Sequence, residues 1–251
     1  MKILVTNDDG YESEGIIVLA EALREIGEVT VVAPDSDRSG SGHSVTVRHP
    51  ITVERVDGRS VHTFKCSGTP ADCVIAGAYE FCGGLPELVV SGINRGANLG
   101  DDVNYSGTVA AAIEALLVGV PSVAVSLAAN WPHESPVHHW ESAAFAAVDV
   151  AKRLLAEPVG LRTLLNVNVP NLPKAEILGS EYTRQGRKRY TERLARDDDG
   201  RRYWVWGKAE FSDNAPDADV SVVANGRISI TPIRLERTDD EALERLRGVI
   251  A

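Results

Sequence analysis

The sequence predicts an α/β fold in which helices flank a doubly wound, mostly parallel, Rossmann-like sheet. Short apolar runs of strand length, KILVT at residues 2–6 and VTVVA at 29–33, alternate with helical segments. Ile16, Leu19 and Leu23 fall at helical spacing between these two runs. A strand–helix–strand unit implies parallel pairing with a right-handed crossover. Polar clusters follow the strands, at the edge where parallel sheets bind ligands.

The same alternation continues to about residue 173. A loosely alternating stretch, interrupted by Asp57-Gly58, predicts a hairpin over 51–65. Thr69 and Pro70 predict the N-cap and first residue of a helix. The runs that follow predict, in order, a strand at 88–91, a helix at 108–118, a strand at 122–126, a helix at 141–155 and a strand at 164–169.

The composition changes in residues 174–251, which we interpret as a C-terminal extension of a single domain spanning residues 1–251. Polar and aromatic runs on either side of DDDG at 197–200 predict a protruding hairpin. Residues 228–233 predict a strand. Thr238, with Glu241 three residues later, predicts a capping box for a short terminal helix. The aromatic hairpin is too apolar to stand alone in water, so we expect the extension to serve in oligomerisation.

The composition limits the classes of binding partner and the cellular compartment that we expect for this protein. The net charge of −10 disfavours a nucleic acid polymer or an anionic membrane as principal partner. No signal peptide is recognisable, and no apolar run approaches the roughly 20 residues of a membrane helix. Cys66, Cys73 and Cys82 fit neither a disulfide framework nor a zinc knuckle. We therefore expect reduced thiols, in or near the core of a cytoplasmic protein.

Three polar clusters are expected to meet at one edge of the sheet. Asn7, Asp8 and Asp9 follow the first strand, 35–41 follows the second, and 91–94 belongs to the third. The adjacent carboxylates would repel a phosphate unless a divalent cation lay between them, and oxygen ligands suit Mg²⁺ or Mn²⁺. The alternative is an Asx-turn that merely closes the strand. A turn that also meets Ser39 and Asn94 favours the metal.

A phosphate site is predicted in the glycine-rich segment that follows. Its glycines allow several backbone N–H groups to face an anion. Ser106, Gly107 and Thr108 begin a helix, whose free N–H groups and dipole favour phosphate. Ser106 by itself could equally be only an N-cap. Asn94 and Asn98 can offer neutral amides to a metal or a phosphate.

Other polar segments carry weaker predictions. His138-His139 and the acidic stretch 213–219 are expected to be solvated surface. The basic run at 184–189 (RQGRKR) could guide an anionic substrate or form a charged hairpin base. The sequence lacks the Gly-x-Ser-x-Gly elbow of a serine hydrolase.

These motifs together resemble the stationary-phase survival protein SurE family of nucleotidases. The similarity covers essentially the whole chain. It is carried by ILVTNDDGYESEGI, VVAPDSDRSGSGHS, GTPADCV and VSGINRGANLGDDVNYSGTVAAAIEA, with later matches in NVNVP, TRQGRKRY and ISITPI. Ala97 departs from the family pattern, in which proline is common at this position. This departure removes no ligand.

The resemblance implies a Rossmann-like core (about 1–173) and an extension (about 174–251) that is exchanged between subunits of a homodimer or homotetramer. It implies hydrolysis of nucleoside 5′- and 3′-monophosphates, and in some members of short polyphosphate, with one divalent metal ion. By motif matching, the metal ligands are Asp8, Asp9, Ser39 and Asn94, and the phosphate-binding helix start is Ser106, Gly107 and Thr108.

The proposed mechanism gives Asp8 and Asn98 the catalytic roles. Asp8 would orient or deprotonate the attacking water, and the Asn98 amide would stabilise the transferring phosphoryl group. The sequence does not distinguish these roles from a direct attack of the Asp8 carboxylate on phosphorus. A nucleotide-binding regulatory module without turnover is the alternative function. The acidic pair argues against it, since a pure binder could use lysine there and need no metal.

Overall fold

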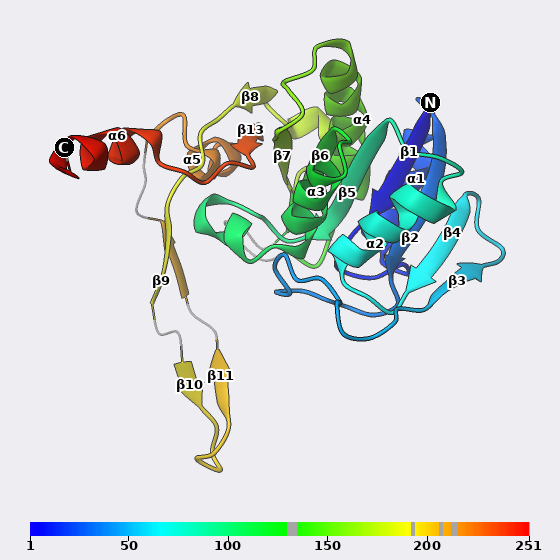
Figure 1. Cartoon of the computed structure of the whole chain (residues 1–251), viewed down its shortest axis with the longest axis horizontal. Coiled ribbons are helices and arrows are strands. Elements are labelled where there is room, and N and C mark those ends of the chain that lie inside the picture. Colours follow the sequence, from blue (N-terminus) through cyan, green and yellow to red (C-terminus); the bar gives the residue numbers. More distant parts are fainter. Residues whose placement is uncertain (130–134, 192–193, 206–207, 212–214, 251) are drawn as a thin grey trace.

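The structure is a computed structural model that describes residues 1–129, 135–191, 194–205, 208–211 and 215–250 (Figure 1). Its elements in chain order are β1 (Lys2–Thr6), α1 (Glu14–Leu23), β2 (Glu28–Pro34), β3 (Val53–Val56), β4 (His62–Cys66), α2 (Pro70–Ala76), a π-helical turn (Gly77–Phe81), β5 (Leu88–Arg95), a 3₁₀ turn (Gly100–Asn104), α3 (Gly107–Leu117), β6 (Ser122–Ala128), α4 (Trp140–Ala156), β7 (Thr163–Pro170), a second 3₁₀ turn (Lys174–Glu176), β8 (Ser180–Tyr182), β9 (Lys188–Thr191), β10 (Leu194–Arg196), β11 (Tyr203–Val205), β12 (Lys208–Phe211), α5 (Asp219–Ala224), β13 (Ile228–Arg234) and α6 (Asp240–Ile250).

A nine-stranded sheet in the order β3-β4-β2-β1-β5-β6-β7-β13-β8 forms the centre of the molecule. The pairs from β4 through β7 are parallel, whereas β3 and β13 run antiparallel to β4 and β7. The chain moves from β1 to β2 on one side and later returns to β5 on the other. The strand order therefore reverses between β1 and β5, and such a point opens a ligand crevice beyond the carboxyl ends of the strands.

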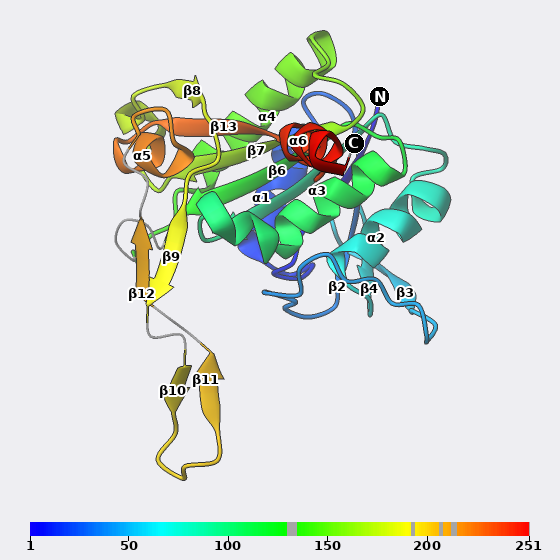
Figure 2. The same ribbon diagram turned by 60° about the vertical axis from the view of Figure 1, so that its left-hand side comes forward.

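Helices cover both faces of this sheet, as a doubly wound fold requires (Figures 1 and 2). On one face, α1 and α4 pack in a buried apolar cluster that includes Ile3 and Leu19. On the other face, α2 and α3 pack in clusters that include Leu4 and Ala111. Consecutive residues of β1 thus face opposite apolar layers. This explains why the strand is apolar throughout rather than alternating. The predicted fold class is confirmed.

The predicted core elements are present, and most ends differ by only one or two residues. The β3–β4 pair is the predicted antiparallel hairpin. Thr69 caps α2, because its hydroxyl accepts the Asp72 N–H at 3.2 Å. The largest difference is β5, which was predicted to end at Ser91 but continues to Arg95. A register shift against β6 allows this extension.

Residues after 173 extend the same sheet and also leave it. β13 and β8 add two strands to the β7 edge. β9 pairs with β12 and β10 with β11 in an antiparallel arm. Both views show this arm projecting away from the sheet (Figures 1 and 2). The predicted protruding hairpin is therefore confirmed, although residues 192–193 and 206–207 lie outside the described residues.

The prediction of a solvated acidic loop at 213–219 is wrong at its end. Asp219 begins α5 and is fully buried. Its two carboxylate oxygens accept the backbone N–H groups of Gly100 and Gly186, each at 2.9 Å. Buried acids are tolerated where such hydrogen bonds replace water. Residues 213–214 of the stretch lie outside the described part of the chain.

Two further local predictions are also wrong. The N-cap of α6 is Asp239 rather than Thr238, because the Asp239 carboxylate accepts the Ala242 N–H at 2.8 Å. His138 and His139 are half-buried rather than solvated. The His138 ring lies 5.2 Å from the Trp140 ring, measured between centroids.

The predicted state of the three thiols agrees with the structure. Cys66, Cys73 and Cys82 are buried and free. Over the described ranges, no helix has the length and apolar character needed to cross a membrane.

Candidate functional site

A cavity of about 580 Å³ lies at the carboxyl end of the sheet, beside the reversal between β1 and β5. It draws its wall from the loop after β1, the loop after β2, the end of β5 with the loop that follows, the start of α3, and the arm. The structure therefore brings together five residues of the predicted site that are distant in sequence, namely Asp8, Ser39, Asn94, Asn98 and Ser106.

The turn after β1 is closed by Asn7 rather than by the two acids. The Asn7 side chain accepts the Gly10 N–H at 3.2 Å and donates to the Gly10 carbonyl at 2.9 Å and to Ser13 Oγ at 2.7 Å. The Asx-turn that the sequence left open as an alternative therefore exists, but at Asn7. Asp8 and Asp9 are not needed to close this turn.

Asp8 lies almost completely buried between the sheet and α3. Its Oδ1 accepts the hydroxyl of Thr108 at 2.5 Å. Burial raises the pKa of the Asp8 carboxyl, while hydrogen bonding to Thr108 works in the opposite direction. The carboxylate is thus held in a fixed place at the N-terminus of α3, where a helix favours negative charge.

Asp9 lies beside the cavity, with its Oδ2 accepting the backbone N–H of Arg95 at 3.1 Å. Burial and the adjacent charge of Asp8 raise the pKa of Asp9 to about 6. A raised pKa means that the ionised pair is unfavourable in the protein without a bound cation. Among the described residues, Asp9 is a neighbour of the cavity wall and not part of it.

Ser39 is carried by the loop after β2, which crosses over the end of β1. The backbone N–H of Arg38 donates to the Asp8 carbonyl at 2.8 Å, and the Arg38 guanidinium donates to the Ser67 carbonyl at 2.9 Å. The Ser39 hydroxyl and N–H both donate to Asp37, at 2.6 and 2.7 Å. The lone pairs of Ser39 Oγ therefore remain available to coordinate a cation. Asp37 adds a third acid near the pair.

Asn94 follows an irregular stretch of β5. Gly92 has φ +140°, and a Cβ there would lie 2.3 Å from the Val125 carbonyl, so only glycine fits this close approach. The Asn94 Nδ2 donates to the Gly96 carbonyl at 2.8 Å. With its nitrogen occupied, the amide oxygen is the atom that Asn94 can offer to a cation.

The start of α3 contacts Asp8 and also carries the N-cap residue of the helix. Ser106 Oγ accepts the Val109 N–H at 3.1 Å, so the N-cap alternative is realised while Ser106 also lines the cavity. Thr108 is fully buried. A Cβ on Gly107 would lie 2.8 Å from the Cβ of Asp8. Gly107 and Thr108 therefore contact the acid directly, and of the three residues Ser106 faces the cavity.

Sequence reasoning missed the opposite wall, which the base of the arm supplies. Lys188 and Tyr190 line the cavity and both contact the Asp102 carboxylate, Lys188 as an ion pair and Tyr190 through its hydroxyl. Tyr105 and Arg95 complete this wall. The basic run at 184–189 was the available signal, but the sequence could not show which of its cations reaches the site.

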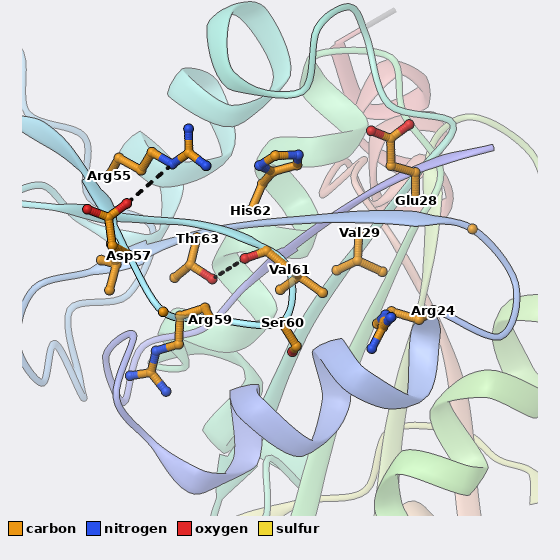
Figure 3. Close-up of a pocket in the computed structure, with 13 residues that line it drawn as sticks. Arg24, Glu28, Val29, Arg55, Asp57, Arg59, Ser60, Val61, His62 and Thr63 are labelled. Atoms are coloured by element: carbon orange, nitrogen blue, oxygen red, sulfur yellow. Dashed lines mark hydrogen bonds and ion pairs between the residues drawn. The ribbon is translucent and has the colours of Figure 1, made fainter.

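A second cavity of about 340 Å³ lies at the amino ends of β2 and β4, on the opposite edge of the sheet (Figure 3). Its visible polar contacts are local: Arg55 faces Asp57 at 3.7 Å, and Thr63 donates to the Val61 carbonyl at 3.1 Å. None of the predicted site residues lines this cavity. The predicted site residues therefore gather at the cavity at the carboxyl end of the sheet.

The set of oxygen donors at the carboxyl-end cavity fits a hard divalent cation. Asp8, Ser39 and Asn94 present oxygen atoms in one wall, and Asp9 adds a second carboxylate beside them. Burial is the main cause of the raised pKa values of the two acids, with a smaller contribution from neighbouring carboxylates, and a bound cation would offset both effects. Within the described ranges, no cluster of three or more His, Cys, Asp and Glu residues is arranged to hold a metal. The candidate ligands are instead carboxylate, hydroxyl and amide oxygens, which are ligands of the kind that hard divalent cations accept.

Comparisons with known proteins place these observations in a family. The sequence profile described as "Survival protein SurE" matches residues 3–192. "5'-nucleotidase SurE" of Alkalilimnicola ehrlichii is 44% identical over 100% of this chain and 96% of that protein. "5'-nucleotidase SurE" of Stenotrophomonas maltophilia (strain R551-3) is 47% identical over 98% of this chain and 94% of that protein. The crystal structure of the SurE protein from Aquifex aeolicus superposes with a TM-score of 0.85 at 38% identity, covering 100% of both chains.

Proposed function

The chain belongs to the Survival protein SurE family, and from this premise we propose that it is a metal-dependent phosphomonoesterase. Its substrates are nucleoside 5′- and 3′-monophosphates, which it hydrolyses to nucleoside and phosphate, and short polyphosphate is a further substrate. The relatives named 5'-nucleotidase SurE support the nucleotidase activity. The 3′ activity and the polyphosphate activity are the finer parts of this proposal.

One divalent ion, Mg²⁺ or Mn²⁺, is held by Asp8, Asp9, Ser39 and Asn94 in this proposal. When bound, such an ion supplies Lewis-acid charge to an oxygen of the substrate phosphate. Its second effect is electrostatic, because it turns an acidic cavity in a protein of net charge −10 into one that attracts an anion.

The protein's own groups have separate roles around the phosphate. Asp8, whose carboxylate is fixed by Thr108, orients the attacking water or removes its proton. Asn98, from the loop after β5, and Ser106, at the helix start, stabilise negative charge on the transferring phosphoryl group. Gly107 and Thr108 contribute by allowing the helix N-terminus to approach Asp8 closely.

A single observation carries the proposal: a buried carboxylate at the end of β1 lines a cavity together with Asn94, Asn98 and the start of α3, and its acidic neighbour lies beside that cavity. Acids in a cavity that receives a phosphate make chemical sense with a cation between acid and phosphate. The positive charge of Lys188 in the opposite wall gives an anionic substrate a second partner.

Phosphate release tests this proposal. Purified protein is assayed over a panel of nucleoside 5′- and 3′-monophosphates and short polyphosphate, with Mn²⁺ or Mg²⁺ and with a chelator. We expect release only with metal, and its loss in Asp9→Asn but not in Asp57→Asn, an exposed carboxylate in the β3–β4 hairpin. Tight nucleotide binding without release would instead support a regulatory module.

Assembly and compartment belong to the same proposal. The arm exposes Leu194, Tyr203 and Trp204, with exposed fractions of 61%, 51% and 67%. Such apolar surface on a two-stranded arm needs a partner, and we propose that a second copy of the chain provides it in a homodimer or homotetramer. The free buried thiols support a reducing compartment, and we propose the cytoplasm.

A further inference from the structure

Two asparagines on β7 are fully buried in a strand that is otherwise apolar. Asn166 and Asn168 alternate with Leu165 and Val167, which pack in the cluster formed with α1 and α4. The two amides therefore share the opposite face, the face that α3 covers. Burying an amide is costly unless it is hydrogen-bonded, so the partners of these two side chains show what they do.

The hydrogen bonds of both asparagines converge on the backbone of Asn98. The Asn98 N–H donates to Asn168 Oδ1 at 2.8 Å, and the Asn98 carbonyl accepts from Asn168 Nδ2 at 3.0 Å. Asn166 Nδ2 donates to the same carbonyl at 2.9 Å. Asn168 thus binds the peptide groups of Asn98 from both sides, as a neighbouring strand would, and Asn166 adds a second donor.

The side chain of Asn98 is held as well. Its Nδ2 donates to Ser126 Oγ at 2.8 Å, and Ser126 pairs in register with Asn168 across the sheet. Asn98 lies in the loop between β5 and the 3₁₀ turn, where no ladder of its own fixes the backbone. The plane of an amide that lines the cavity is therefore fixed by side chains of β6 and β7.

We propose that Asn166 and Asn168 are positioning residues for the Asn98 amide, and this rests on the proposed function for the reaction served. They hold a cavity-lining group from a single strand, β7, without contacting the substrate. Misplacement of such a group by about 1 Å can cost on the order of 10²-fold in rate. Asn168 should matter more than Asn166, because Asn168 bonds both peptide groups of Asn98 and Asn166 bonds only the carbonyl.

The competing interpretation is that the asparagines only stabilise the fold. The chain offers a matched control in Ser229, which is fully buried and pairs in register with Asn168 from the next strand. Ser229 Oγ bonds Thr183 Oγ1 at 2.8 Å and belongs to a hydroxyl cluster with Thr231. Its loss removes a buried polar group beside Asn168 without removing a partner of Asn98.

The experiment compares Asn168→Ala, Asn166→Ala and Ser229→Ala for kcat, KM, Mn²⁺ affinity by calorimetry, and hydrogen exchange of the 96–100 segment. We expect kcat to fall by about 10- to 100-fold in Asn168→Ala and less in Asn166→Ala, with Mn²⁺ affinity within about 3-fold. Exchange in this segment should accelerate in the same order. Ser229→Ala should leave both kcat and this exchange within about 2-fold of the parent.

A double-mutant cycle separates positioning from stability. If Asn168 acts through the Asn98 amide, Asn168→Ala should add little loss of kcat once Asn98→Ala is present. Additive losses, or an equal loss in Ser229→Ala, would overturn the inference. If Asn168→Ala does not fold, Asn168→Asp replaces it, because it keeps the acceptor for the Asn98 N–H and loses the donor.

The outcome is independent of whether the proposed function is right. A parent protein that releases no phosphate from any substrate in the panel contradicts the nucleotidase proposal alone. Hydrogen exchange at 96–100 still tests the positioning role of Asn168 in that case. Faster exchange in Asn168→Ala than in Ser229→Ala supports this role, and equal exchange refutes it.

Discussion

The hydroxyl of Thr108 donates a hydrogen bond to the carboxylate of Asp8, which joins the first turn of α3 to the end of β1 across 100 positions of the sequence. The bond fixes the acid on which the proposed chemistry depends. It also shows that the helix N-terminus stabilises a protein carboxylate, next to the place proposed for the substrate phosphate.

The acidic pair should be needed for turnover and not for folding. We expect Asp8→Asn and Asp9→Asn each to lower kcat/KM by about 10²-fold or more, by analogy with the loss of one transition-state contact. Calorimetry with Mn²⁺ should show weakened binding in both variants. Full turnover of Asp9→Asn in the presence of chelator would remove Asp9 from the proposed ligand set.

The stability of the metal-free protein should depend on pH through Asp9. Its folded-state pKa is raised to about 6 from an ordinary value of 3.8, so the folded protein binds the proton more tightly than the unfolded chain. The associated stability is present below the ordinary pKa and is lost as pH rises through the folded one. Asp9→Asn should therefore gain about 1–3 kcal/mol over the parent at pH 7.5, and much less at pH 4.5.

Denaturant unfolding in chelator at the two pH values measures this difference. Asp57→Asn, which changes an exposed carboxylate, should show no such pH-dependent gain. An Asp9→Asn variant with the same pH profile as the parent would mean that the acidic pair carries no strain in the metal-free protein.

Ser106→Ala tests whether the helix start also binds the substrate. Loss of the cap to Val109 should lower stability by about 1 kcal/mol. Because Ser106 lines the cavity, we also expect a higher KM or a lower kcat, with Mn²⁺ affinity unchanged. A variant that loses the stability alone would make Ser106 an N-cap and nothing more.

Gly107→Val tests the close contact between the start of α3 and Asp8. A Cβ at this position would lie 2.8 Å from the Cβ of Asp8. We expect Gly107→Val to weaken Mn²⁺ binding and turnover together, and intact Mn²⁺ affinity in this variant would contradict the packing.

Lys188 should supply positive charge to the substrate. It lines the cavity and forms an ion pair with Asp102, and the side chains of both are largely buried. We expect Lys188→Gln to raise KM for nucleotides by about 10-fold, near the 1.4 kcal/mol that corresponds to a factor of ten. Lys188→Arg should retain most of the affinity.

Arg187→Ala is the matched control for Lys188. It removes an adjacent but exposed cation from the same basic run. If the run acts only through its overall charge, the two charge-removing variants would raise KM equally, and this would contradict a specific role for Lys188.

The arm should hold subunits together. We expect the parent to sediment as a dimer or larger at micromolar concentration, and Trp204→Glu to shift it toward the monomer. Leu161→Glu, which alters an equally exposed apolar residue outside the arm, should not. A parent that sediments as a clean monomer would refute the assembly proposal.

Much of the fold was determined by local sequence. The apolar runs of β1, β2 and β7 identify buried parallel strands, because both faces of each strand are covered. Thr69 and Pro70 predict the start of α2, because capping depends on neighbouring residues only. Polar residues directly after β1 and β2 and within β5 identify the edge at which the predicted site residues meet, because the carboxyl ends of parallel strands lie at one edge of a sheet.

Only the tertiary structure shows the roles of residues that depend on contacts with residues remote in sequence. In the sequence, Asp219 resembles a solvated acid. In the fold it is buried and accepts the N–H groups of Gly100 and Gly186, which are remote in sequence. In the sequence, Lys188 is one cation of a basic run, and only its ion pair with Asp102 shows that it lies in the cavity wall. Asn168 is one residue of a strand, and only its hydrogen bond with Asn98 shows its role. Each role depends on a partner 33 to 119 positions away. Sequence periodicity reports which face a residue takes, and only packing between elements fixes what that face meets.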